Sequence, residues 1–386
     1  MNPIKPLRRL GTNQAQSTDY PVGTSSPPNM SRPKFSIGVT TYNRPGLLKQ
    51  CLGTILAQEF QDFEVIVGND YVSQPLTAET LGLGDPRIRL VNYEQNLGEL
   101  GNLNALLSMA RGEYFTWLAD DDYYDPGFLF DVRNALLADG DLPVIYTAYH
   151  VVRSYSTSPR AVRQSTKSAA VRLLTGREFL RDYWRNSVKV IGLMGVYRTD
   201  YIRSIGGAAN LANSRIAIMS EWFLLIQSGL LERVGYLERP LFYFRAHPDS
   251  WSATSADGAG YSIAGINILR RSIPIFQDPR LKDDFESNLS GLLKLILLAV
   301  AKFGARKNGG FSVRQMLKYF SLLKLECRKL AIESCQPHVK TSLRNAGMYL
   351  YRLMPSIMLV SILPPKMLYL IQRIRGRFSG EISDES

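Results

Sequence analysis

The first regular segment of the chain alternates large apolar residues with smaller ones. Phe35, Ile37 and Val39 have the period of two that predicts a strand, and the apolar positions after Pro45 recur at helical spacing. Similar patterns continue along the first third of the chain. The predicted elements are strands at 34–41, 63–67, 88–93 and 114–118 and helices at 47–56 and 98–110. This order predicts an α/β fold, with a mostly parallel sheet covered by helices on both faces.

Polar clusters follow three of these predicted strands directly. They are Tyr42-Asn43-Arg44, Asn69-Asp70 and Asp120-Asp121-Asp122. In open α/β sheets, ligands bind in the crevice beyond the carboxyl ends of the strands. The shared position of the clusters therefore predicts one ligand site at that edge.

The acidic run Asp120-Asp121-Asp122 indicates a cation site. Adjacent carboxylates repel one another unless a cation or hydrogen-bond donors offset the charge, and Mg²⁺ and Mn²⁺ prefer oxygen ligands. Asp120 and Asp122 would project to the same side if the strand continued through them. A turn that only caps the next helix, at Asp125-Pro126, is the alternative interpretation.

Elements change character near the middle of the chain. Strands are predicted at 188–197 and 241–245 and helices at 199–205 and 220–228, whereas only long amphipathic helices are predicted beyond residue 266. The Ser-, Pro- and Thr-rich start is typical of disorder. The predicted organisation is a disordered segment at 1–33, a catalytic domain at 34–260, a basic helical region at 266–378 and a tail at 379–386.

The net charge of +12 is distributed unevenly along the chain. Residues 266–378 hold 20 Lys/Arg and 6 Asp/Glu, whereas residues 1–265 hold 26 and 25. A uniformly basic chain would indicate nucleic acid, and no nucleic-acid partner is predicted here. Basic residues around apolar helix faces fit an anionic membrane surface, and a helical subdomain packed on the catalytic body is the alternative. The uncharged run between Arg352 and Lys366 is too short to span a bilayer.

Cysteine usage and the N-terminal composition bear on location. Cys51, Cys327 and Cys335 are scattered and odd in number, which is typical of reduced thiols. The start of the chain lacks the apolar stretch of a secretory signal. We therefore expect a cytoplasmic protein that binds peripherally at the inner face of the plasma membrane.

Four segments between residues 34 and 130 together resemble the family 2 glycosyltransferases, which have the nucleotide-sugar-binding GT-A fold. They are Ser36 to Pro45, Phe63 to Asp70, Asn96-Leu97-Gly98 with Asn102, and Ala110-Arg111-Gly112 through Asp120-Asp121-Asp122 to Pro126. The resemblance implies a hexosyltransferase-type enzyme of surface polysaccharide or glycolipid biosynthesis. Its partners would be a nucleoside-diphosphate-sugar donor, a saccharide or lipid-linked acceptor, and Mn²⁺ or Mg²⁺ as cofactor.

The resemblance also implies roles for individual residues. Donor-binding roles fall on Thr40, Tyr42, Asn43, Arg44, Asp70, Asn96, Asn102, Asp120 and Asp121. Metal-binding roles fall on Asp120, Asp122 and His247. Many members of the family place an acid immediately after the last leucine of the strand, and this chain has Ala119 there. Which pair of aspartates bridges the cation therefore stays open.

A second motif resembles the part of the family that binds the acceptor. In Ser220-Glu221-Trp222, the carboxylate stands at the start of a predicted helix, where the family places its general base. Glu221 is therefore the predicted base of an inverting displacement. A glutamate that only stabilises the helix dipole is the alternative. Further on, Arg245 and His247 are expected near the leaving diphosphate.

Two other functions stay open at this point. A nucleotidyltransferase also uses a metal-binding aspartate on a parallel sheet, but it would need a glycine-rich basic loop after the first strand, and residues 40–46 hold one Arg and one Gly. A non-catalytic membrane-surface binding protein would explain the basic third. It would leave the polar clusters at the strand ends without a role.

Overall fold

A computed structural model of the protein describes residues 32–138, 140, 142–152, 170–246, 258–303 and 312–362. The segment predicted to be disordered lies outside these residues except for Arg32 and Pro33. His247 and the tail at 379–386 also lie outside them. From Pro33 onward, the described residues belong to one compact unit.

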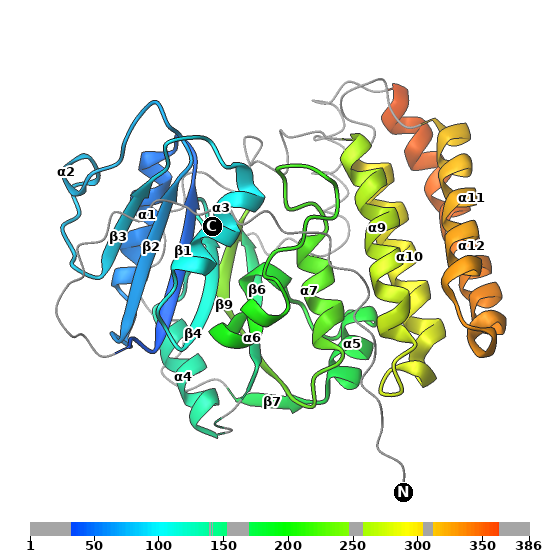
Figure 1. The fold of residues 1–386 in the computed structure, drawn as a ribbon, viewed down its shortest axis with the longest axis horizontal. Helices are drawn as coiled ribbons and strands as arrows, with labels where there is room; N and C mark the ends of the chain where they lie inside the picture. The colour runs from blue at the N-terminus through cyan, green and yellow to red at the C-terminus, as the bar shows by residue number, and fades with distance from the viewer. Residues whose placement is uncertain are drawn as a thin grey trace, which may run out of the picture. The chain divides into compact units, whose positions relative to one another are not determined.

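A single sheet forms the scaffold, with strand order β3-β2-β1-β4-β8-β6-β9-β5 and with β7 paired to β9 (Figure 1). The strands are β1 (Phe35–Thr41), β2 (Phe63–Asn69), β3 (Ile88–Asn92), β4 (Tyr114–Ala119), β5 (Tyr123–Tyr124), β6 (Val144–Val152), β7 (Val171–Leu174), β8 (Val196–Arg198) and β9 (Val234–Arg245). The sheet is parallel from β3 to β4 and mixed beyond β4. The predicted α/β class is confirmed.

Helices cover both faces of this sheet. On one face, Leu48 and Leu52 of α1 (Pro45–Leu56) and Val132 of α4 (Phe128–Ala138) pack on the inward side chains of β1, β2 and β4. On the other face, Leu103 and Leu106 of α3 (Gly98–Met109) pack with residues of α6 (Thr199–Ser204) and α7 (Ser220–Ser228). Successive side chains of a strand point to opposite faces, so alternate residues of β4 pack with the helices on one face and on the other. The shorter helices are α2 (Ala78–Leu81) and α5 (Gly176–Trp184).

The strand predicted at 188–197 is mostly wrong, since β8 covers only Val196–Arg198. A 3₁₀ turn, Gly192–Met194, occupies the middle of that segment. A Cβ atom on Gly192 would lie 2.0 Å from the carbonyl oxygen of Glu221, so the backbone at Gly192 packs directly on the start of α7. This close packing replaces strand pairing. At the other end of the domain, β9 begins seven residues before the strand predicted at 241–245.

Four long helices follow the sheet. They are α9 (Gly258–Phe276), α10 (Phe285–Phe303), α11 (Val313–Leu330) and α12 (Gln336–Ile362), with short 3₁₀ turns at Lys282–Asp284 and Glu333–Cys335. α10 packs against α9 and α12, and α11 also packs against α9 and α12. Helix α12 continues through Pro355. Within the described part of the chain, no helix is both long enough and apolar enough to cross a bilayer.

The core of these four helices extends into the sheet-containing part. Leu180 of α5 and Phe223 and Ile226 of α7 belong to the same buried cluster as Leu269 and Leu293. Helix α9 begins at Gly258, inside the stretch where the sequence changes character. The division into domains at 34–260 and 266–378 stays a prediction. The three cysteines are buried and free, as the sequence indicated.

Candidate active site

The carboxyl ends of β1, β2 and β4 meet at one edge of the sheet. Thr40 of β1 lies opposite Ala119 of β4, and Thr41 lies opposite Asn69 of β2. The amide of Asp120 donates to the carbonyl of Thr40 at 3.2 Å, and the amide of Asp70 donates to the carbonyl of Thr41 at 3.1 Å. These bonds place all three predicted polar clusters at this edge.

The acidic run forms a turn, because the amide of Asp122 donates to the carbonyl of Ala119 at 3.1 Å. β4 therefore ends at Ala119, and the strand geometry that would project Asp120 and Asp122 to one side is absent. Instead, the Arg44 guanidinium spans two consecutive carboxylates, with Asp120 at 2.5 Å and Asp121 at 2.8 Å. The Thr41 hydroxyl donates to the other oxygen of Asp120 at 2.6 Å.

Asp122 faces a different element from its two neighbours. Its Oδ1 accepts the backbone N–H of Arg245, at the end of β9, at 2.8 Å. The side chain of Arg245 is itself buried, lies over the ring of Tyr123 at 5.4 Å and donates to Gln50 at 3.2 Å. Arg245, which the resemblance placed near the diphosphate, thus supports the acidic run through its backbone N–H.

Buried negative charge is incompletely compensated in this cluster. Burial raises the pKa of Asp120 to about 7, although Arg44 opposes the shift. Burial and the neighbouring Asp121 raise the pKa of Asp122 well above its ordinary value. Three carboxylates thus share two arginines, Arg44 and Arg245. Oxygen donors with excess negative charge fit a hard divalent cation, so the residues present are compatible with Mn²⁺ or Mg²⁺.

The number of protein ligands for such a cation is small. Among the residues that the structure describes, no group of three or more His, Cys, Asp or Glu side chains is arranged to hold a metal ion. His247, predicted as a third ligand, lies outside the described residues. A site that supplies one or two carboxylates and leaves positions for phosphate oxygens is typical of Mg²⁺ with a nucleotide substrate.

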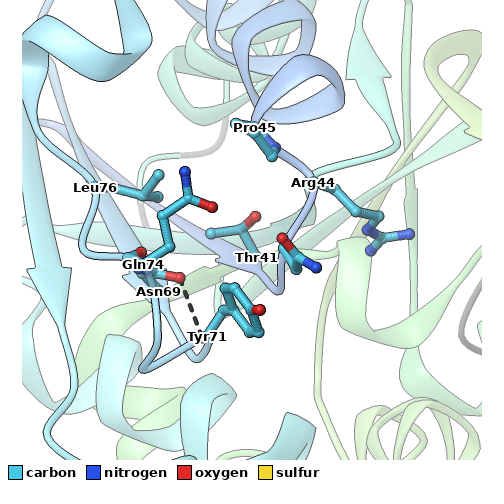
Figure 2. Close-up of a pocket in the computed structure, with 8 residues that line it drawn as sticks. Thr41, Arg44, Pro45, Asn69, Tyr71, Gln74 and Leu76 are labelled. Atoms are coloured by element: carbon cyan, nitrogen blue, oxygen red, sulfur yellow. Dashed lines mark hydrogen bonds between the residues drawn. The ribbon is translucent and has the colours of Figure 1, made fainter.

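A small pocket lies beside the acidic run (Figure 2). Its walls come from the turn after β1 and from the loop after β2, and its lining residues are Thr41, Asn43, Arg44, Pro45, Asn69, Tyr71, Gln74 and Leu76. Asn43 has a positive φ of 53°, a conformation that asparagine tolerates better than most residues, and this turn carries the chain from Tyr42 to Arg44. Tyr42 is 49% exposed and meets Tyr71 edge to face, with ring centroids 5.2 Å apart. The exposed ring of Tyr42 and the half-buried ring of Tyr71 therefore lie together at this pocket.

The loop after β2 is fixed by paired asparagines. Asn69 donates to Asn92 at 2.8 Å and to the carbonyl of Gln74 at 2.9 Å, and Asn92 accepts the amide of Leu76 at 2.7 Å. The amide of Tyr71 donates to the side chain of Asn69 at 3.1 Å (Figure 2). These bonds hold Tyr71 and Gln74 against the pocket.

Asp70, Asn96 and Asn102 hold backbone in this structure. The carboxylate of Asp70 accepts the amides of Leu97 and Gly98, at 2.5 and 2.8 Å, where α3 begins. Burial raises the pKa of Asp70, and these two amides oppose the shift. Asn96 donates to the carbonyl of Asp70 at 3.1 Å, and Asn102, which is buried, donates to the carbonyl of Gly68 at 2.9 Å. All three position the polar loops, and their direct contact with a donor stays a prediction.

Glu221 stands in the first turn of α7, as predicted. Burial raises the pKa of its carboxyl to about 7, and the nearby Glu99 adds to the shift. The residue two positions before it, Met219, has a φ of 60°, which is rare for a residue with a side chain. Unusual backbone of this kind concentrates at functional sites because the surrounding structure must hold it in place.

The sequence did not single out four residues near these groups. Tyr71 and Gln74 line the pocket, the charge of Glu99 raises the pKa of Glu221, and Arg215 donates to the side chain of Asn96 at 2.7 Å. Tyr71 directly follows Asp70 at a strand end, which is a signal that could have identified it. Gln74 belongs to the same loop, whereas Glu99 and Arg215 are held through contacts distant in sequence, and no local pattern marks these two.

Comparison with known proteins agrees with this geometry. Residues 36–204 match the model of the family described as glycosyl transferase family 2. An uncharacterized glycosyltransferase of Rickettsia prowazekii is 28% identical over 146 residues, which are 38% of this chain and 45% of that protein. A Campylobacter jejuni protein named GalNAc(5)-diNAcBac-PP-undecaprenol beta-1,3-glucosyltransferase is 39% identical over 93 residues, 23% of this chain and 30% of that protein. The chain thus covers less than half the length of each of these curated relatives.

A solved structure has the same fold over most of the chain. The crystal structure of S. aureus TarS 1-349 in complex with UDP-GlcNAc is 17% identical, with a TM-score of 0.54 over 84% of this chain and 91% of that one. The shared architecture confirms the expected GT-A fold. The family match begins in β1 and includes the whole acidic run, so the part of the chain that carries the candidate site is similar to glycosyl transferase family 2.

Proposed function

We propose that the protein transfers a sugar from a nucleoside-diphosphate sugar to an acceptor hydroxyl. The observation that carries the proposal is the bridge from Arg44 to Asp120 and Asp121, beside the pocket at the carboxyl edge of the parallel strands. Charge develops on the diphosphate as the glycosidic bond breaks, so cationic groups at this edge stabilise the transition state. A nucleotidyltransferase remains less well supported, because no glycine-rich phosphate loop follows β1.

The pocket beside this bridge suits the nucleoside. Thr40 stands near the end of β1, Tyr42, Asn43 and Arg44 form the turn after it, and the exposed ring of Tyr42 offers a surface for a base. Aromatic rings stack on any base because every base has a π-face. One or two carboxylates of the acidic run, Asp120 to Asp122, would hold Mn²⁺ or Mg²⁺, and the cation would neutralise charge on the leaving diphosphate.

Glu221 is the proposed general base. The acceptor oxygen forms a bond to the anomeric carbon, the bond from that carbon to the diphosphate oxygen breaks, and Glu221 takes the hydroxyl proton. One displacement inverts the anomeric configuration. A carboxyl with a pKa of about 7 suits this role, since it is both substantially ionised and basic near neutral pH.

The acceptor and the location follow from chemistry and from similarity. The name of the Campylobacter relative specifies an undecaprenol-linked saccharide acceptor. We propose a saccharide or lipid-linked acceptor for this chain, in surface polysaccharide or glycolipid biosynthesis. Such an acceptor would place the enzyme at the inner face of the plasma membrane, where basic helices can bind anionic lipid.

The test is turnover of a panel of UDP-, GDP- and dTDP-sugars by the full chain, with Mn²⁺, with Mg²⁺ and with chelator. Slow donor hydrolysis releases nucleoside diphosphate in the absence of acceptor, so the acceptor need not be known. The proposal predicts release from at least one donor. Release from none of them, together with no detectable binding of any donor, would contradict it.

A further inference from the structure

The outer pair of C-terminal helices presents a face that is both basic and apolar. α11 and α12 pack on each other and on α9 and α10, and α5 and α7 pack on α9 and α10 from the other side (Figure 1). The buried side chains of α11 and α12, such as Leu323 and Leu350, belong to the shared core. The opposite sides of these two helices are therefore open to solvent.

Exposed apolar side chains occupy the middle of this outer face. On α11, Leu322 is 54% exposed and Leu325 is 61% exposed, and on α12 Met348 is 53% exposed and Tyr351 is 74% exposed. At 100° per residue, Leu325 and Met348 lie near the centre of the exposed arc of their helices. Soluble surfaces do carry single exposed apolar residues, but several that share one face indicate an interaction surface.

Basic residues surround these side chains. Residues 312–362 hold eight Lys/Arg and two Asp/Glu. Seven of the eight basic residues are exposed, and these are Arg314, Lys318, Arg328, Lys329, Lys340, Arg344 and Arg352. One of the two acids, Glu326, is paired with Arg270 of α9 at 2.8 Å, which leaves the positive charge of the outer face largely uncompensated.

We infer that this outer face, defined by the exposed residues of α11 and α12 named above, docks on an anionic phospholipid surface. The inference rests on the proposed function, because docking on a membrane would bring the enzyme to a lipid-linked acceptor. The positive charge attracts anionic headgroups, and Leu, Met and Tyr side chains can enter the interfacial layer. A second copy of the chain would bring two positive faces together, and a nucleic acid would leave Leu325 and Met348 without apolar contact.

The charged residues of these helices also distinguish adsorption on a membrane surface from insertion across the bilayer. Lysine and arginine interrupt the apolar residues of both helices, at Lys318 and Lys324 on α11 and at Arg344 and Arg352 on α12, and neither described helix offers the continuous apolar stretch that crosses a bilayer. Adsorption would depend mainly on charge. Each Lys or Arg near an anionic leaflet strengthens the attraction, and salt screens that contribution.

The experiment is flotation of the full chain with vesicles of phosphatidylcholine alone or of phosphatidylcholine containing phosphatidylglycerol. We expect flotation only with phosphatidylglycerol, and release as NaCl rises from about 0.1 M to about 1 M. The variant Lys318→Gln/Arg344→Gln/Arg352→Gln should lower the partition coefficient by about ten-fold or more. The variant Lys49→Gln/Lys282→Gln/Lys294→Gln removes the same charge from exposed sites elsewhere, and should float like the wild type.

A second variant tests the apolar part of the face. Leu325→Ser/Met348→Ser alters two exposed side chains and should lower partitioning several-fold without changing donor hydrolysis. Equal losses in the outer-face variant and its charge-matched control would overturn the inference. So would equal binding to both vesicle types, or binding to duplex DNA in place of vesicles. Flotation does not require turnover, so this result and the failure of the proposed function are distinguishable.

Discussion

Arg44 lies 2.5 Å from Asp120 and 2.8 Å from Asp121, so one guanidinium joins the turn after β1 to the turn after β4. Both carboxylates are buried, whereas about a quarter of the Arg44 side chain, 27%, is exposed. Arg44 is therefore both part of the packing at this edge and accessible from the adjacent pocket. The same residue can stabilise the empty site and meet a diphosphate.

The ion pair should contribute measurably to stability. Arg44→Gln leaves Asp120 with less compensation for its buried charge, and should lower the free energy of unfolding by about 2 kcal/mol. Denaturant unfolding measures this change. In an Asp120→Asn background, Arg44→Gln should lower the free energy of unfolding by at least about 1 kcal/mol less than it does in the wild type, because the charge that Arg44 compensates is gone. Lys49→Gln, an exposed change on α1, is the control, and purely additive effects would refute the coupling.

Tyr42 should bind the donor through its ring. Tyr42→Ala removes a surface on which a base can stack, an interaction worth about 1–3 kcal/mol per base, and should raise the Kd for the nucleoside diphosphate by ten-fold or more. Tyr42→Phe keeps the ring and should bind within about two-fold of the wild type. Calorimetric titration measures both variants. Equal weakening by the two variants would instead assign the role to the hydroxyl.

Asp70 and Asn102 both hold backbone, but only Asp70 stands between two residues that line the pocket, Asn69 and Tyr71. Asn102→Ala leaves the buried carbonyl of Gly68 without its donor and should cost about 1–3 kcal/mol of stability with little change in donor affinity. Asp70→Asn removes charge beside the amides of Leu97 and Gly98 and should cost about 1 kcal/mol. If Asp70 also contacts the base, the Kd for the donor rises in Asp70→Asn and not in Asn102→Ala. An equal rise in both would show that the effect is a loss of structure.

Glu221 should control the acid side of the pH profile. A base must be deprotonated to accept a proton, and burial raises the pKa of Glu221 to about 7. With the identified acceptor, kcat/KM should therefore fall as pH drops below about 7 and level off above it. Glu221→Gln should lower kcat by about 10²-fold or more with donor binding unchanged, and the pH dependence left in this variant should be that of Asp120, whose pKa is also raised to about 7.

Glu99 supplies the matched control for that profile. Its charge adds to the upward pKa shift of Glu221, and its Oε2 accepts the amide of Ala217 at 3.0 Å. Glu99→Gln can keep that hydrogen bond while it removes the charge, so the acid limb should move to lower pH. A profile that does not move in Glu99→Gln would exclude Glu221 as the titrating base.

Local patterns in the sequence were enough to predict the part of the sheet that carries the site. Period-two runs ended by polar turns predicted β1, β2 and β4, because these strands are buried and their turns need residues such as Asn43 and Pro45. The segment at 188–197 misled the prediction, since its apolar residues pack around a 3₁₀ turn at Gly192. Helical packing and strand burial require the same residue types there.

The contacts within the site could not be predicted in the same way. The bridge from Arg44 to two consecutive aspartates depends on the turn that ends β4 at Ala119, and a continued strand would have paired Asp120 with Asp122 instead. The asparagine pair Asn69 and Asn92 and the proximity of Glu99 to Glu221 join residues from separate elements. Such contacts follow from the folded arrangement, and no local spacing encodes them.

The most direct measurement of the central claim compares donor hydrolysis by Asp122→Ala and by Asp62→Ala. Asp122 is buried in the acidic run, whereas Asp62 is exposed at the opposite, amino end of β2. With the donor identified from the panel, kcat/KM should fall by about 10²-fold or more in Asp122→Ala and stay within about two-fold of the wild type in Asp62→Ala. Unchanged hydrolysis in a folded Asp122→Ala protein would contradict the assignment of the acidic run to donor activation.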